Sequence, residues 1–168
     1  LGFLDDPERS FASAPRRKDG NSATVASVAI GARSFIVKRY NINGFLQRLR
    51  VSLRHRTRGR NAWRFGQLLH DAGVPTARPI ALLERRRGGL RDTCYLVMED
   101  LGDRDLRAVL GAGVDVVPPA HLVRSVCELF AALARLRVGH GDTKAANFLV
   151  VGERVALIDL DSMRPDVN

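Results

Sequence analysis

A short polar segment, residues 140–147, carries three side chains that suit phosphoryl transfer: Asp142, Lys144 and Asn147. A carboxylate such as Asp142 can accept the proton of an attacking hydroxyl group and hold its oxygen in line with a γ-phosphate. Lys144 can offset the charge that develops during transfer, and Asn147 offers a neutral oxygen to Mg²⁺. We therefore predict Asp142 and Lys144 as catalytic residues and Asn147 as a metal ligand. The alternative is a polar loop that merely closes a helix.

A second carboxylate, Asp159, ends an apolar segment a short distance further along the chain. Mg²⁺ that bridges two phosphates is held by one or two carboxylates of this kind. A strand that ends in Asp is common at turns, but the position of Asp159 after residues 140–147 strengthens its assignment as a metal ligand. Asp161, two residues on, is interpreted as either a further ligand or a structural acceptor.

Two features near the start of the chain suit phosphate binding. Lys38 ends the apolar run 35–37, where its ammonium group would reach the α- and β-phosphates of ATP. Upstream, Gly20, Asn21 and Ser22 are small residues whose backbone N–H groups can face phosphate oxygens. Only one of them is glycine, so a full glycine-rich loop is absent. A lysine that ends a strand is often simply solvated. Here the assignment of Lys38 to phosphate binding is supported by its position in the chain before Asp142 and Asp159.

The segment 98–102 follows an apolar strand and contains Glu99 and Leu101. We expect the backbone groups of these two residues to bind adenine, although an ordinary turn between lobes would have the same composition. The order of Lys38, Asp142 and Asp159, together with the four residues between Asp142 and Asn147, is that of kinases.

Hydrophobic periodicity and turn residues predict the elements that position these side chains. An N-terminal stretch, residues 1–17, shows little periodicity. Strands are predicted at 24–30, 34–38, 80–84, 93–98, 148–151 and 155–160. Helices are predicted around 62–69, over 120–138, and in a short segment to Leu110 that Asp105 caps, with a linker at 111–119.

This order predicts an α+β class with a protein-kinase-like two-lobed fold. Residues 1–98 form the small sheet-rich nucleotide-binding lobe, and residues 99–168 form the hinge and part of the helical catalytic lobe. The chain stops at Asn168, nine residues after Asp159. We therefore expect the helical lobe to be truncated.

The segments 37–41, 73–79, 140–150 and 157–164 closely resemble the lipopolysaccharide kinase (Kdo/WaaP) family. The resemblance covers roughly residues 19–164. It implies an ATP- and Mg²⁺-dependent kinase that phosphorylates a Kdo or heptose hydroxyl of the lipopolysaccharide inner core, at the cytoplasmic face of the inner membrane. Two other functions stay open: a kinase of proteins or other small molecules, and a truncated, non-catalytic module that binds nucleotide or polyanions.

The predicted helix at 62–69 departs from the kinase pattern. Kinases generally pair the strand lysine with a glutamate of this helix. Here no acidic residue lies between Lys38 and Asp71. Gln67 could partly substitute, or Lys38 could pair with Asp159.

Charge is distributed unevenly over the chain, whose net charge is +9. No acidic residue occurs between Gly20 and His70. Segment 48–64 contains seven arginines: Arg48, Arg50, Arg54, Arg56, Arg58, Arg60 and Arg64. We expect this segment to bind an anionic membrane surface rather than nucleic acid, although a solvated basic face is the simpler alternative.

The remaining composition excludes several classes of protein. The chain is 45% hydrophobic and 27% charged, which argues against disorder. It contains no apolar run of about 18 residues, so no membrane-spanning segment is expected. The two cysteines, Cys94 and Cys127, lie in apolar stretches and are expected to be reduced core thiols.

Overall fold

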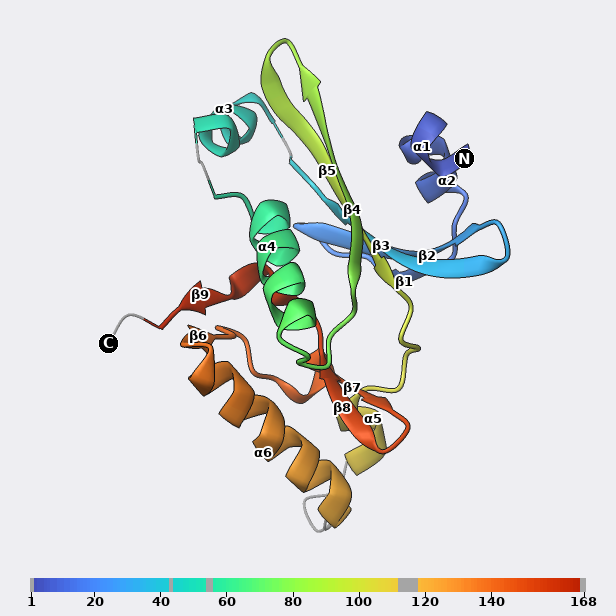
Figure 1. The fold of residues 1–168 in the computed structure, drawn as a ribbon. Helices are drawn as coiled ribbons and strands as arrows, with labels where there is room; N and C mark the ends of the chain where they lie inside the picture. Colours follow the sequence, from blue (N-terminus) through green and yellow to red (C-terminus); the bar gives the residue numbers. More distant parts are fainter. Residues whose placement is uncertain (1, 43, 54–55, 112–117, 167–168) are drawn as a thin grey trace. The chain divides into compact units, whose positions relative to one another are not determined.

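The computed structural model describes residues 2–42, 44–53, 56–111 and 118–166, and the chain divides into two compact units (Figure 1). The first unit comprises Leu1–Trp63 and Pro79–Asp100, and the second comprises Arg64–Arg78 and Leu101–Asn168. By packing, residues 64–78 therefore belong with the later part of the chain, and residues 99 and 100 with the earlier part. The functional boundary predicted between residues 98 and 99 stays a prediction.

The first unit is built on an antiparallel five-stranded sheet with strand order β1-β2-β3-β5-β4 (Figure 1). Its strands are β1 (Arg16–Lys18), β2 (Ala23–Ile30), β3 (Arg33–Tyr40), β4 (Pro79–Arg87) and β5 (Leu90–Glu99). Strands were predicted at all of these places except β1, and each is longer than its predicted core. β2 and β3 form the expected hairpin, in which Gly31 takes a φ of 63° at the turn.

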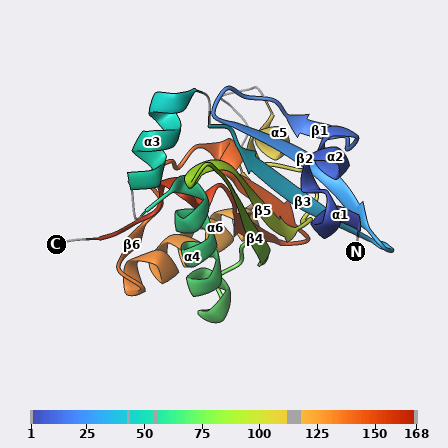
Figure 2. The ribbon, with the colours of Figure 1, turned by 90° about the horizontal axis from the view of Figure 1, so that it is seen from above.

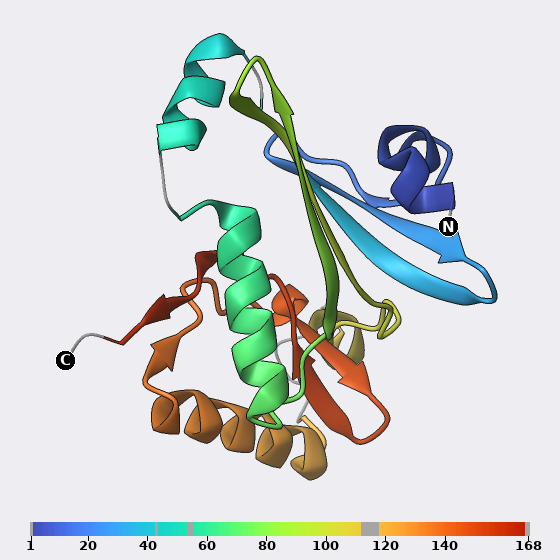
Figure 3. The same cartoon turned by 45° about the horizontal axis from the view of Figure 1, so that its top comes forward.

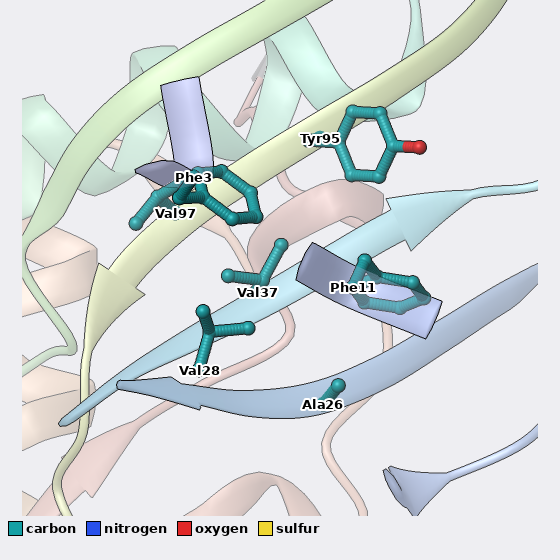
Figure 4. Close-up of a cluster of buried hydrophobic side chains, with 7 residues drawn as sticks. All are labelled: Phe3, Phe11, Ala26, Val28, Val37, Tyr95 and Val97. Carbon is teal, nitrogen blue, oxygen red and sulfur yellow. The ribbon is translucent and has the colours of Figure 1, made fainter. Parts of the chain in front are cut away.

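Two short helices, α1 (Gly2–Asp5) and α2 (Pro7–Ala12), cover one face of this sheet over β2 and β3 (Figure 2). Phe3 and Phe11 contribute their rings to a buried cluster with Val37 and Tyr95, and both rings meet Tyr95 edge-on (Figure 4). Elements of this length do not complete enough turns to show a period, which explains why residues 1–17 gave no helical signal. The Asp6 side chain caps α2 by accepting a bond from the Arg9 N–H at 3.1 Å.

The opposite face of the sheet carries Lys38, Tyr40 and Cys94, because side chains alternate along a strand. α4 (Arg58–Asp71) begins on this face at Gly59, where an added Cβ would lie only 2.5 Å from the Cys94 Sγ. Burial raises the pKa of the Cys94 thiol to about 12, so this cysteine is an inert core residue as predicted.

The described part of the second unit contains the end of α4 from Arg64 onward, two further helices, two short strand pairs and two short 3₁₀ turns (Figure 1). Its elements are α5 (Leu106–Leu110), α6 (Ala120–Arg135), β6 (Val138–Gly139), η1 (Ala145–Asn147), β7 (Phe148–Val151), β8 (Arg154–Leu157), η2 (Leu160–Ser162) and β9 (Arg164–Pro165). β6 pairs with β9, and β7 pairs with β8, both antiparallel. Asp105 caps α5 as predicted, since its carboxylate accepts a bond from the Ala108 N–H at 2.7 Å.

Two predictions for α6 are wrong. The helix ends at Arg135 instead of continuing to Val138, because Arg137 turns the backbone to a φ of 53° and Val138 joins β6. Cys127 is exposed rather than in the core, because it lies outside the buried stripe of Leu122, Leu129 and Leu133. Most of the predicted linker, residues 112–117, lies outside the described residues.

Among the described helices, none combines the length and the apolarity needed to cross a membrane.

Candidate active site

The loop between β6 and β7 brings together the polar residues predicted in segment 140–147. His140 is buried and accepts a bond on Nδ1 from the Asp142 N–H at 3.3 Å, which leaves its Nε2 to donate to the Ile158 carbonyl at 3.0 Å. Asn147 Nδ2 donates to the Asp142 carbonyl at 2.9 Å. His140 and Asn147 therefore hold the backbone of Asp142 from both sides.

Gly141 lets this loop approach the turn that follows β8. It has a φ of 78°, and a Cβ at this position would lie 2.5 Å from the Ser162 carbonyl oxygen. Only glycine fits so close an approach without displacing backbone. The Asp142 loop and η2 are consequently packed against each other within the second unit.

Asp142 and Lys144 form an ion pair, with 2.9 Å between Oδ2 and Nζ. The Lys144 ammonium lowers the pKa of the Asp142 carboxyl, and the Asn147 side chain adds to this effect, while desolvation and the nearby charge of Asp159 oppose it. The Asp142 carboxyl is therefore deprotonated at neutral pH. In turn Asp142, followed by Asp159 and Asp161, raises the pKa of Lys144. One cation thus faces three carboxylates in this site.

Asp159 lies two residues after the end of β8, which stops at Leu157 and not at residue 160 as predicted, and it has a left-handed conformation with a φ of 62° and a ψ of 53°. Such a conformation is uncommon for a residue with a side chain, and it is typically retained at functional sites. The preceding residue is fixed by a bond from the Ile158 N–H to the Asn147 carbonyl at 2.9 Å. Asp161 is buried in η2 and accepts a bond from Ser162 Oγ at 3.3 Å, so one of its roles is structural.

Oxygen donors dominate this cluster, and that set is suited to Mg²⁺. The bond from Asn147 Nδ2 to Asp142 fixes the orientation of the amide and leaves its Oδ1 as an acceptor. Together with the Asp159 carboxylate this amide oxygen could hold an ion such as Mg²⁺, which keeps waters and binds substrate phosphates. The described residues contain no cluster of three or more His, Cys, Asp or Glu side chains able to hold a metal.

Lys38 and the predicted phosphate loop occur at the same end of the sheet in the first unit. Lys38 is buried in β3 and pairs with Val25 of β2 and Leu96 of β5. Gly20, Asn21 and Ser22 form the turn that leads into β2, three residues before Val25. The nitrogen of Lys38 also lies 5.2 Å from the centre of the Tyr40 ring.

Asn41 is a residue of this region that sequence reasoning missed as part of the site. Its Nδ2 donates to the Gly20 carbonyl at 3.1 Å, and its N–H donates to the Ser22 carbonyl at 3.1 Å. Gly20 itself is confined, because a Cβ there would lie 3.0 Å from the Ala23 carbonyl oxygen. No spacing rule could have found Asn41, since the pairing of β2 with β3 is what brings it to the turn.

Glu99 ends β5 opposite Phe35, three residues along β3 from Lys38. At about 3.3 Å per residue, this separation along the strand is about 10 Å, which suits the distance from adenine to phosphate in a nucleotide. Asp100 then anchors the exit of the strand by accepting bonds from Arg17 at 2.7 Å and from Ser34 Oγ at 3.1 Å. Leu101 is the first residue of the second unit in this segment.

Apart from Glu99 in the first unit and Leu101 in the second, the predicted site residues therefore fall into two groups that are each assembled within one unit. The second unit brings together Asp142, Lys144, Asn147 and Asp159, and the first brings Lys38 to the same sheet end as the 20–22 turn.

The chain is similar in fold to a solved structure of WaaP in complex with acyl carrier protein. The two share 21% sequence identity with a TM-score of 0.65, over 96% of this chain and 67% of that one. This likeness confirms the predicted protein-kinase-like fold. Among curated proteins, none matches the chain.

The family comparison covers nearly every residue. The model of the lipopolysaccharide kinase (Kdo/WaaP) family matches residues 2–167, which confirms the resemblance identified from the motifs. Members of this family are phosphotransferases that act on sugar hydroxyl groups. The chain belongs to the lipopolysaccharide kinase (Kdo/WaaP) family.

Proposed function

We propose that this kinase transfers the γ-phosphate of ATP, in the presence of Mg²⁺, to a Kdo or heptose hydroxyl of the lipopolysaccharide inner core. Family membership makes it a lipopolysaccharide core kinase, and a kinase takes its phosphate from ATP. The observation that supports the proposed phosphate transfer is that Asp142, Lys144 and Asp159 lie close enough to influence one another's charge.

Asp142 is the proposed base. Its carboxylate accepts the proton of the sugar hydroxyl while that oxygen forms the new bond to the γ-phosphorus and the bond to the β-phosphate oxygen breaks. Lys144 lowers the pKa of Asp142, so the carboxylate is a weak base. Its main role is therefore to orient the hydroxyl, and it accepts the proton late in the transfer. Lys144 offsets negative charge on the transferring phosphate.

Asn147 and Asp159 are the proposed ligands of Mg²⁺. When bound, the ion would neutralise charge on the phosphates of ATP. The two side chains would hold it with oxygen atoms, as the orientation of the Asn147 amide favours. The left-handed backbone of Asp159 would place its carboxylate beside the loop that carries Asp142.

The first unit supplies the proposed nucleotide contacts. Lys38 would bind the α- and β-phosphates, and the backbone of Gly20, Asn21 and Ser22 would bind the terminal phosphates. Backbone groups of Glu99 and Leu101 would bond adenine.

The helix α4 lacks an acidic partner for Lys38 before Asp71. In the ion pair between α4 and the sheet, the helix supplies the cation and the sheet supplies the carboxylate. Arg60 of the helix donates to Glu84 of β4, with 2.9 Å from Nε to Oε1. Arg60 and Glu84 thereby fix the start of α4 without involving Lys38.

The proposed location is the cytoplasmic face of the inner membrane, where segment 48–64 would hold the anionic surface that carries the substrate. Nucleic acid is not proposed as a partner.

Two alternative functions are kept. The missing helix carboxylate favours a non-catalytic module that binds nucleotide. Within the enzyme class, the alternative is a kinase with a protein or other small-molecule acceptor.

A direct test offers the protein several acceptors together with ATP labelled in the γ-phosphate. The acceptors are purified core oligosaccharides that end in Kdo or in heptose, and a mixture of soluble proteins. The proposal predicts that label enters an inner-core oligosaccharide and depends on Mg²⁺. Label in proteins alone would support the other kinase, and nucleotide binding without transfer to any acceptor would support the non-catalytic module.

A further inference from the structure

The helix α3 (Phe45–Leu53) is amphipathic in the reverse of the usual sense: its polar side contacts the protein and its apolar side faces outward. A helix on a globular domain normally buries its apolar stripe against the core. None of the residues of α3 is buried. This inversion is the feature of the first unit that its fold does not explain.

Three polar contacts hold α3 against β5. Ser52 Oγ accepts a bond from the Arg91 N–H at 2.8 Å, and the Val51 carbonyl accepts one from the Arg91 guanidinium at 2.8 Å. Arg48 forms an ion pair with Asp92, at 2.8 Å between Nη2 and Oδ1. Arg48, Val51 and Ser52 therefore define the side of the helix that faces the sheet.

The other side presents four large apolar residues. The exposed fractions are 68% for Phe45, 75% for Leu46, 38% for Leu49 and 76% for Leu53. At 100° per residue, these positions cover an arc of about 100°. Phe45, Leu46 and Leu53 are each more exposed than Val123, which at 46% is the most exposed large apolar residue elsewhere in the described chain. A contiguous exposed apolar face of this kind marks an interaction surface.

Arginines flank this face on two sides. Arg50 of α3 and Arg56, which follows the helix, are exposed, and Arg85, Arg86 and Arg87 are exposed at the tip of the β4–β5 hairpin. Figure 3 shows that tip beside α3, and Figure 1 agrees. Arg86 pairs with Arg91, whose guanidinium reaches α3, so the hairpin and the helix form one surface.

We propose that α3 and the tip of the β4–β5 hairpin bind the anionic lipid surface, with Phe45, Leu46, Leu49 and Leu53 inserted among the acyl chains near the headgroups. Apolar residues on one side and arginines around them are the arrangement by which interfacial helices bind anionic membranes. The inference deepens the proposed function, because the proposed substrate is a membrane lipid, and it rests on that function for the identity of the membrane. Segment 48–64 was expected to bind the membrane through the charge of its arginines alone, whereas here the apolar side chains of α3 also enter the lipid.

The arginines of segment 48–64 do not contribute equally to this surface. Arg48 and Arg60 are engaged with Asp92 and Glu84, and Arg58 lies over the Tyr40 ring at 5.7 Å. Arg54 and His55 lie outside the described residues. The hairpin arginines, which sequence reasoning did not group with segment 48–64, take part in their place.

The test measures binding of the protein to vesicles of phosphatidylcholine with about one third phosphatidylglycerol, without nucleotide or sugar. The variant Phe45→Ser, Leu46→Gln, Leu53→Gln should bind on the order of tenfold more weakly or worse, since three apolar side chains no longer enter lipid. The matched control, Val123→Ser on α6, removes an exposed apolar residue from the second unit and should bind like the wild type. Both variants should melt near the wild-type temperature, because the changed residues are exposed.

Salt separates the two parts of the interaction. High salt should remove the contribution of the arginines and leave measurable wild-type binding, whereas the triple variant should lose binding altogether. In a Leu46→Trp variant, brominated lipids should quench the added fluorescence.

Several results would overturn the proposal. They are wild-type binding that vanishes completely at high salt, equal binding by the triple variant, or absence of vesicle binding. A wild-type dimer in sedimentation that the triple variant abolishes, without lipid binding, would assign the face to a second copy of the chain instead. Since no reaction takes place in this assay, a failure to phosphorylate sugars would refute the proposed function and leave the membrane result standing.

Discussion

The catalytic loop and the surface of α3 are both rich in charge, but they use it differently. In the loop, residues 140–147, four polar residues are bound to partners: His140 to Asp142 and Ile158, Asp142 to Lys144, and Asn147 to the Asp142 backbone. On α3, Arg48 and Ser52 bind the helix to β5 and leave its apolar side outward. Charge therefore fixes the geometry of a reaction site in one region and supports an apolar contact face in the other.

The largest expected effect concerns the proposed base. Asp142→Asn keeps the shape of the side chain and removes its charge, so ATP should still bind while kcat falls on the order of 10²-fold or more. Steady-state kinetics with a core oligosaccharide measure this. Asp71→Asn, at the end of α4, is a matched control and should have near-normal kcat. A near-normal kcat in Asp142→Asn would remove this carboxylate from the mechanism.

Nucleotide affinity should depend on Asp159. Asp159→Ala removes a proposed ligand of Mg²⁺, so ATP should bind on the order of tenfold more weakly, and EDTA should weaken wild-type binding in the same direction. Calorimetric titration with and without EDTA checks both. Tight binding that neither change affects would show that Asp159 does not act through a metal.

The close approach of the loop to η2 should make Gly141 sensitive. Gly141→Ala adds a Cβ at a φ of 78° against the Ser162 carbonyl, and should cost about 2–3 kcal/mol of unfolding free energy. Gly88 also has a positive φ, of 58°, but an added Cβ meets nothing within 4 Å. Gly88→Ala should therefore cost only about 1 kcal/mol. Denaturant unfolding of the two variants compares them, and equal costs would contradict the predicted steric contact.

The structural arginines should be distinguishable from the exposed ones by stability. Arg60→Ser breaks the ion pair with Glu84, which is itself mostly buried, and should cost about 1 kcal/mol. Arg56→Ser should leave the melting temperature unchanged, because Arg56 is exposed. Thermal unfolding measures both, and equal stabilities would mean that the ion pair does not fix α4.

The smallest effect is a shift in the titration of Asp142. In Lys144→Met the pKa of the Asp142 carboxyl should rise, since its main cause of lowering is gone and the charge of Asp159 remains. In the wild type, the ionised Asp142 carboxylate contributes to folding stability. This contribution is fully present above the pKa that Asp142 has in the unfolded chain, and it is lost as the pH falls through the lower pKa of the folded protein. Carboxyl carbon NMR titration follows the shift, and an unchanged pKa would exclude the ion pair in solution.

Much of the catalytic region could be predicted because its polar residues lie close together in the sequence, at the spacing found in kinases. The distances along the chain between Asp142, Lys144, Asn147 and Asp159 indicated one site, and the second unit assembles these residues. Phe3 and Phe11 could not be placed, because helices as short as α1 and α2 have no readable period. Asn41 was missed since strand pairing brings it to the 20–22 turn.

The α3 surface shows the opposite case. Segment 48–64 was predicted as one basic patch, but composition does not reveal which arginines pair with Asp92 or Glu84. Helical spacing identifies an apolar stripe in α3, yet it cannot say that this stripe faces outward. The contribution of Arg85–87 depends on the register of the β4–β5 hairpin, which only the folded chain defines.

Locating the transferred phosphate would test directly whether this protein phosphorylates an inner-core sugar. Wild-type protein is incubated with ATP, Mg²⁺ and purified inner-core oligosaccharide, and the product is analysed by mass spectrometry and ³¹P NMR. We expect one phosphate monoester on a Kdo or heptose hydroxyl, formed by the wild type and nearly absent with Asp142→Asn. Absence of any sugar phosphate with the wild type, or equal formation by Asp142→Asn, would contradict it.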